Sequence, residues 1–196
     1  RSTHDRFQSS RGTLYDYARR KDGQIFHITR DGRLALWDID WDGQIAGLIE
    51  YAGGGPVAVD GQGNWISAFM TGCSAKDLLL GRLAPASPAE DYQRTPLRFG
   101  TDECWVPEAN MASDGGNLIF IVANPKAELI RFNTQTLVLD RLGKRYGATD
   151  RSLGVSVYGG KVYQTIRSRH QIDVYNATGA PAFIQTLPVG LVAPEL

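Results

Sequence analysis

The stretch that decides the fold runs from Asp22 to Thr71 and reads DGQIFHITRDGRLALWDIDWDGQIAGLIEYAGGGPVAVDGQGNWISAFMT. Its short apolar runs, separated by turns rich in Asp and Gly, are Gln24–Thr29, Arg33–Ile39, Gln44–Tyr51 and Val57–Asp60. Asp-Gly between β-prone runs is the strongest short-range hairpin signal, because glycine adopts a positive φ without a Cβ clash. The stretch therefore predicts one antiparallel meander and the start of a second.

A glycine placed before a strand recurs four times along the chain. The pattern is Gly-x-apolar-apolar, and its glycines are Gly23, Gly63, Gly116 and Gly160. They are 40, 53 and 44 residues apart, and a second strand is expected 11 to 15 residues after each one. A third strand follows most clearly at Ile45–Tyr51, Leu137–Leu142 and Ala182–Leu187. Four units of four strands at such a period are the signature of a β-propeller.

We therefore predict an all-β chain, a β-propeller of four-stranded antiparallel blades with about four blades in 196 residues. Stacking such blades radially would cover both faces of each sheet and leave only short edges exposed. Residues 1–11 are expected to form a flexible arm, and residues 12–196 the propeller domain. The expected units are about residues 12–55, 56–107, 108–152 and 153–189, with residues 190–196 starting a further strand. That further strand favours a larger propeller, completed by a missing segment or a partner chain.

The second unit carries the longest insertion, within residues 72–98, which is rich in proline and alanine. In a propeller such an insertion projects from one rim, where ligand contacts are usually made. A surface insertion tolerated without any function would look the same in the sequence.

Composition narrows the classes of partner. The net charge is zero, which argues against nucleic acid as the main partner. No run approaches the roughly 18 apolar residues that a membrane span needs. The two cysteines, Cys73 and Cys104, could form a disulfide or remain two buried thiols. The sequence leaves the compartment open, with a secreted or periplasmic location favoured.

A D-x-D-x-D-G string suggests a calcium loop. Asp38, Asp40 and Asp42 stand at alternate positions before Gly43, so their carboxylates could converge on one hard cation. The twelfth position of an EF-type loop requires Glu, but here it is Ile49. A hairpin turn with solvent-facing aspartates is therefore the alternative to Ca2+ or another divalent metal.

Two further places in the sequence could contact a ligand. Trp41 lies in the aspartate-rich turn, where we expect it to be exposed and able to stack on a sugar. Arg167, Arg169 and His170 lie close together and could hold an anion. An ordinary exposed basic turn would have the same composition. No residue has the setting of a catalytic triad.

Several stretches resemble known propeller repeats. Leu34–Ile39, with the dipeptide Trp37-Asp38, resembles one WD-type repeat when taken with residues 58–68. Residues 118–133 and 162–178 are similar to units of NHL-type and gluconolactonase-type propellers. In the gluconolactonase type, Glu and Asn from inner strands bind a divalent metal in the central channel. The resemblance implies that role for Glu108, with Asn110 beside it, although no matching set stands in the other units.

The leading hypothesis is a binding or scaffolding module that recognises a protein, peptide or glycan on one rim. It rests on repeated blades, neutral charge and the lack of a coherent catalytic set, and fold alone does not determine function. The alternative is a lactonase-type or lyase-type enzyme with a divalent ion in the channel.

Overall fold

The computed structural model describes part of the chain. The described residues are 14–19, 25–29, 34–37, 45–49, 56–70, 77–85, 87, 91–98, 106–124, 126–142, 146–147, 149–180 and 182–190. Of these, only the backbone is described for residues 14–49, 69–70, 77–79, 97–98, 106–109 and 124. Several predictions lie outside the described residues: the arm at 1–11, residues 191–196 of the further strand expected at 190–196, Trp41, Asp38, Asp40, Asp42, Cys73 and Cys104.

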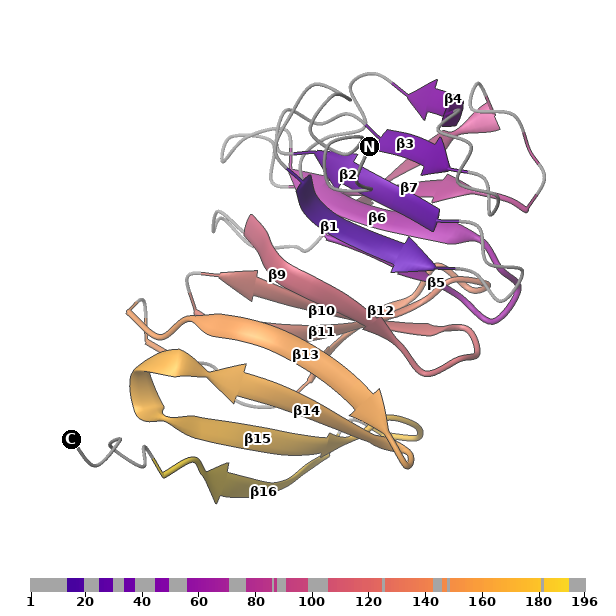
Figure 1. The fold of residues 1–196 in the computed structure, drawn as a ribbon. Helices are drawn as coiled ribbons and strands as arrows, with labels where there is room; N and C mark the ends of the chain where they lie inside the picture. The colour runs from indigo at the N-terminus through magenta and orange to yellow at the C-terminus, as the bar shows by residue number, and fades with distance from the viewer. Residues whose placement is uncertain are drawn as a thin grey trace. The chain divides into compact units, whose positions relative to one another are not determined.

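The strands form four antiparallel sheets, each with its strands in chain order (Figure 1). The first two sheets are β1 (Leu14–Arg19), β2 (Ile25–Thr29), β3 (Leu34–Trp37), β4 (Ile45–Ile49), and β5 (Val57–Val59), β6 (Trp65–Met70), β7 (Asp77–Leu83), β8 (Gln93–Arg98). The other two are β9 (Val106–Ser113), β10 (Leu118–Asn124), β11 (Glu128–Asn133), β12 (Leu139–Leu142), and β13 (Ser152–Tyr158), β14 (Lys161–Ile166), β15 (Gln171–Asn176), β16 (Phe183–Pro188). The described residues contain no α-helix, and no helix among them has the length and apolar character needed to cross a membrane. The predicted all-β class with four-stranded antiparallel sheets is confirmed.

The chain divides into two compact units, residues 1–107 with 115–117, and residues 108–114 with 118–196. In the first unit, the turn from β5 to β6 shows why a glycine precedes the strand. Gly63 has a φ of 81°, a conformation that a side chain with a Cβ disfavours. The Asp60 carboxylate accepts hydrogen bonds from the backbone N–H of Asn64 at 2.9 Å and of Gln62 at 3.0 Å. The turn is thus closed by a side chain as well as by the backbone.

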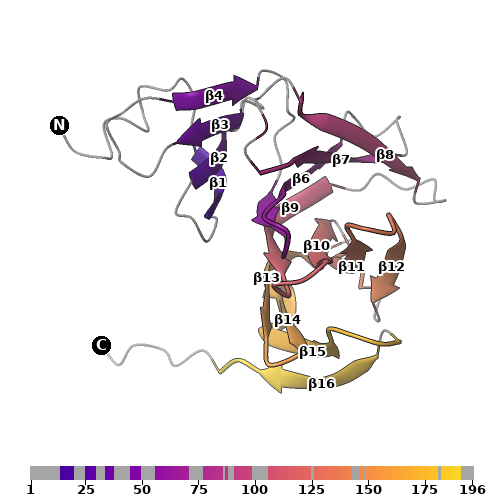
Figure 2. The same ribbon diagram turned by 90° about the vertical axis from the view of Figure 1, so that its right-hand side faces the viewer.

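In the second unit, a continuous apolar core joins the two sheets. Its buried side chains come from β10–β12 and from β13–β15, and the next residue after β15 completes it: Phe120, Val122, Leu129, Leu142, Val155, Val162, Tyr175 and Ala177. Strands β10 and β13 lie side by side, as Figure 1 shows. Figure 2 shows β16 at the edge of its sheet, next to β15.

One predicted strand begins later than expected. The prediction placed it at Leu137, but β12 begins at Leu139. Leu137 has a φ of 59° and donates its N–H to the Asn133 carbonyl at 2.9 Å. The Asn133 side chain also accepts from the N–H of Gln135 at 2.9 Å. This local turn uses the backbone groups that an extended strand would offer to β11.

Candidate binding site

Three of the predicted ligand-binding residues lie in one turn, Arg167–His170, which we call the basic turn. It joins β14 to β15 and contains a short 3₁₀ segment, Arg167–Arg169. His170 ends the segment with a φ of 47°, and its N–H donates to the Arg167 carbonyl at 3.2 Å. The Arg167 N–H donates to the Arg151 carbonyl at 2.9 Å, and the Val189 N–H to the His170 carbonyl at 2.8 Å. The backbone of the basic turn is therefore hydrogen-bonded to the residue before β13 and to the residue after β16.

The buried carboxylate of Asp150 binds two side chains of the basic turn, those of Ser168 and Arg169. Its Oδ2 lies 3.0 Å from Nη2 of Arg169, and its Oδ1 accepts a hydrogen bond from the Ser168 hydroxyl. The backbone N–H of Gly147 adds a third donor at 3.1 Å. The hydrogen bond from Arg169, followed by that from Ser168, lowers the pKa of Asp150 to about 2. Asp150 therefore stays ionised and orients Arg169 at neutral pH.

The phenol of Tyr146 lies beneath the Arg169 guanidinium, whose central carbon is 5.0 Å from the ring centroid. The Tyr146 hydroxyl donates to the buried Asp173 carboxylate. Gln171 donates to the Tyr146 hydroxyl and to Asp173 Oδ1, each at 2.9 Å, and the Thr186 hydroxyl donates to the same Oδ1 at 2.7 Å. Burial, and then the hydrogen bond to Asp173, raise the pKa of Tyr146. Tyr146 is thus a neutral hydrogen-bond donor, and its bond to Asp173 holds the ring against the Arg169 guanidinium.

The outer surface of this assembly is positively charged. Arg151, Arg167, Arg169 and His170 are exposed, whereas Asp150 is buried beneath them. The Arg169 side chain is bonded to Asp150 and still 52% exposed. Arginine presents N–H donors in a rigid fork that matches a carboxylate, so this surface has the chemistry to hold an anionic ligand.

The predicted metal residues are less completely described. Glu108 lies on β9, but its side chain is outside the described part. The Asn110 carboxamide donates to the Val155 carbonyl at 2.8 Å and accepts the Val155 N–H at 2.9 Å. The carboxamide therefore forms with Val155 the two hydrogen bonds that a neighbouring strand would form. Val155 follows the register shift between Ser152 and Gly154 in β13. The described residues contain no group of three or more His, Cys, Asp or Glu placed to hold a metal ion.

Sequence reasoning did not identify the residues that support the basic turn. Tyr146 and Asp173 are 27 residues apart, and Asp150 and Arg169 are 19 apart. No local motif connects these pairs. They meet because the strands of this sheet pair and because the segment between β12 and β13, which carries Tyr146 and Asp150, lies against β15 and the turn before it. The only sequence signal was the cluster of basic residues itself.

Comparison with known proteins identifies the fold. No protein-family model matches the chain, and no curated protein matches it. A chain of the nidogen/laminin complex, a structure that contains a β-propeller, matches with a TM-score of 0.63 and 13% identity, over 90% of this chain and 64% of that one. U3-55K, a WD40 protein, matches with a TM-score of 0.64 and 12% identity, over 91% of this chain and 52% of that one.

The chain therefore has a β-propeller fold. It spans less than two thirds of each of these two chains, and at such low identity the likeness shows the fold alone. In all, 481 chains of solved structures match it, so the fold does not by itself select a function. The resemblance to WD-type, NHL-type or gluconolactonase-type repeats in particular stays a prediction.

Proposed function

We propose that this chain is a β-propeller binding module that holds an acidic segment of a protein or peptide at the basic turn. The observation that carries the proposal is the half-exposed Arg169 guanidinium held on the buried Asp150 carboxylate, with two further exposed arginines, Arg151 and Arg167, joined by a backbone hydrogen bond. Arg169 is oriented by Asp150 and Tyr146, and the backbone of the turn is bonded on both sides. A pre-oriented set of donors loses less conformational entropy when an anion binds.

Binding fits the described residues better than catalysis does. His170 is exposed, and no serine or cysteine among the described residues hydrogen-bonds to its side chain. The hydroxyl of Tyr146 and the carboxylate of Asp173 are buried and bonded to each other, so neither faces a substrate. Guanidinium groups favour carboxylates over neutral sugars, which supports a peptide ligand rather than a neutral glycan.

The metal-dependent lactonase or lyase alternative remains a second hypothesis. It depends on Glu108, whose side chain is not described, and on Asn110, which is bonded to Val155. The calcium loop of Asp38, Asp40 and Asp42 likewise remains a prediction. Metal content of the purified protein, with melting curves before and after chelation, tests both: a stoichiometric divalent ion that stabilises the fold supports them.

The proposal is tested with a fluorescent hexaglutamate peptide as probe, and with a hexaglutamine peptide as the neutral comparison. An exposed charge pair contributes about 0.4–1 kcal/mol, so R151A and R167A should each weaken hexaglutamate binding about twofold to fivefold. The matched control is K161A, which removes an exposed cation at the opposite end of β14. It should leave the affinity unchanged.

Salt provides a second readout, because screening weakens exposed charge pairs. Hexaglutamate binding should fall between 50 and 200 mM salt by about the same factor in K161A as in the unmodified protein. Failure of hexaglutamate to bind, or an equal loss in K161A, would overturn the proposal. Selective binding of an anionic glycan on an array, without peptide binding, would also overturn it.

A further inference from the structure

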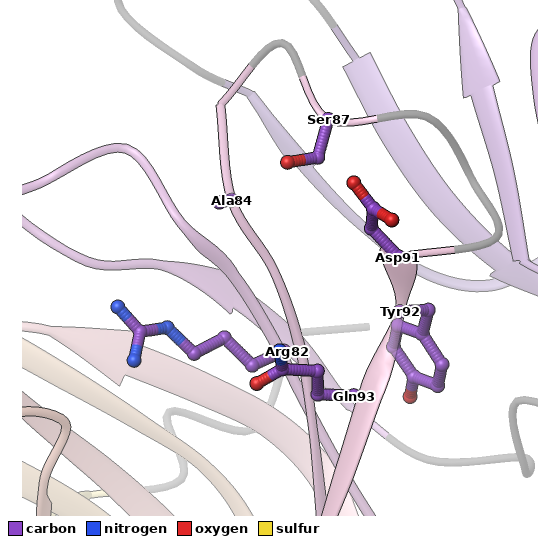
Figure 3. A pocket seen from close by; sticks show the side chains of 6 residues that line it. All are labelled: Arg82, Ala84, Ser87, Asp91, Tyr92 and Gln93. Atoms are coloured by element: carbon purple, nitrogen blue, oxygen red, sulfur yellow. The ribbon is translucent and has the colours of Figure 1, made fainter.

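A cleft lies in the first unit, at the end of the β7–β8 hairpin (Figure 3). It has a volume of about 650 Å³, within the range of small-ligand pockets. Its lining comes from the last residues of β7, the loop and the first residues of β8: Arg82, Ala84, Ser87, Asp91, Tyr92 and Gln93. It therefore belongs to the insertion predicted to project from a rim.

Two of the described lining residues, Arg82 and Asp91, carry opposite charges. Arg82 pairs across the strands with Gln93, and Figure 3 shows its guanidinium group pointing away from Asp91. In the same view the Asp91 carboxylate points toward Ser87, whose hydroxyl group is turned to the side of Ala84. Within the described part of the chain, neither Arg82 nor Asp91 forms an ion pair or a side-chain hydrogen bond. Both charges are therefore available to a ligand.

Tyr92 forms a fixed wall of the cleft. Its hydroxyl lies 2.7 Å from the Ser67 hydroxyl, and the Arg94 guanidinium carbon lies 5.9 Å from its ring centroid. Gly81 makes this position possible, because a Cβ at residue 81 would lie 1.6 Å from the Tyr92 hydroxyl oxygen. Burial raises the pKa of Tyr92, so the phenol stays neutral. The wall adds no charge to the cleft.

We propose that this cleft binds a zwitterionic ligand of amino-acid or peptide chemistry, which presents a carboxylate and an ammonium group together. The Arg82 guanidinium takes the carboxylate, with the Gln93 amide beside it as a further donor. Asp91 takes the ammonium group, with the Ser87 hydroxyl as an additional acceptor. A ligand with a single charge would leave one of the two protein charges unpaired. The site is separate from the basic turn and does not depend on the function proposed for it.

Titration of the ¹⁵N-labelled protein with triglycine tests the proposal, with the side-chain amide of Gln93 and the Nε–H of Arg82 as reporters. N-acetyl-triglycine retains only the carboxylate, triglycinamide retains only the ammonium group, and the doubly blocked peptide has neither. Triglycine should shift both reporters, and each singly charged peptide should bind at least about fivefold more weakly, since one charge-assisted contact is lost. The peptide acetyl-Lys-Gly-Glu-amide carries both charges on side chains, so its binding would indicate a chain segment rather than a free amino acid or peptide.

The variants R82Q and D91N should each weaken triglycine binding about fivefold or more. Neither variant removes a hydrogen bond or ion pair within the described residues, so the fold should be retained. The matched control R167A removes an exposed arginine from the basic turn and should leave triglycine binding unchanged. Equal binding of the doubly blocked peptide, or no effect of either cleft variant, would overturn the proposal. R82Q should leave hexaglutamate binding unchanged, so failure at one site does not decide the other.

Discussion

Replacing Gly81 with alanine tests whether Tyr92 is held in the wall of the cleft. Gly81 lies on β7 opposite Arg94. A Cβ added at this position would lie 1.6 Å from the Tyr92 hydroxyl oxygen, 2.3 Å from its Cζ and 2.4 Å from the Ser67 hydroxyl oxygen. These separations are far below any real Cβ contact, so Tyr92 must leave its position or the strands must separate.

The cost has two parts. An additional methyl group in a packed site typically costs about 1–3 kcal/mol. Displacement of Tyr92 also breaks its hydrogen bond with Ser67, which contributes about 0.5–1.5 kcal/mol. We therefore expect G81A to lower the free energy of unfolding by about 1.5–4.5 kcal/mol.

Urea unfolding followed by circular dichroism measures this change, with G190A as the matched control. A Cβ at Gly190 would meet nothing within 4 Å, so G190A should unfold near the midpoint of the unmodified protein. The cause is isolated by a double-mutant cycle with Y92A, because removing the ring also removes the clash with Tyr92 and leaves only the contact with the Ser67 hydroxyl. The alanine at position 81 should cost at least about 1 kcal/mol less in the Y92A background. An equal cost in both backgrounds, or no loss of stability in G81A, would refute the contact between Gly81 and Tyr92.

Three further predictions concern the second unit. Because the pKa of Asp150 is lowered to about 2, its contribution to the free energy of unfolding is full above pH 4–5 and is lost as the pH falls towards 2. Urea unfolding between pH 2 and 7 should show that D150N removes about 1–2 kcal/mol of this pH dependence. This value allows for solvent screening at the half-exposed Arg169. Y146F deletes the donor to the Asp173 carboxylate and should lower the free energy of unfolding by about 1–3 kcal/mol, and an unchanged urea midpoint would argue against that hydrogen bond. N110A removes the carboxamide that binds the N–H and C=O of Val155, and it should lower the free energy of unfolding by about 1–3 kcal/mol. Native-state hydrogen exchange should show faster exchange of the Val155 amide. Unaltered protection of that amide would contradict this role of Asn110.

The sequence was most informative where structure depends on neighbours along the chain. The Gly-x-apolar-apolar pattern identified where strands begin, and of its three glycines that the structure describes, Gly63 and Gly160 have positive φ values of 81° and 71°. In the third sheet the positive φ, 82°, belongs to Gly115 rather than to the predicted Gly116. The pattern identified the turn, while the position of the left-handed residue within the turn depends on the hydrogen bonds that close it.

The candidate sites were only partly predictable. Arg167, Arg169 and His170 were selected as a basic cluster, and the position of the cleft was anticipated only as an insertion on a rim. The supports that give each site its shape, Asp150 for Arg169 and Gly81 for Tyr92, were not recognised in those roles. Both supports act through contacts between residues that are distant in sequence or on facing strands.

The sequence by itself determined the all-β class, the four-strand unit and the approximate strand positions, because alternation and turn glycines act over a few residues. The tertiary structure alone decided which charges are available. Packing brings Asp150 and Tyr146 to Arg169 and leaves Arg82 and Asp91 in the lining of a cleft without a partner among the described residues. The charge available at a site depends on which side chains approach within a few ångströms, and that is settled when the sheets form and pack.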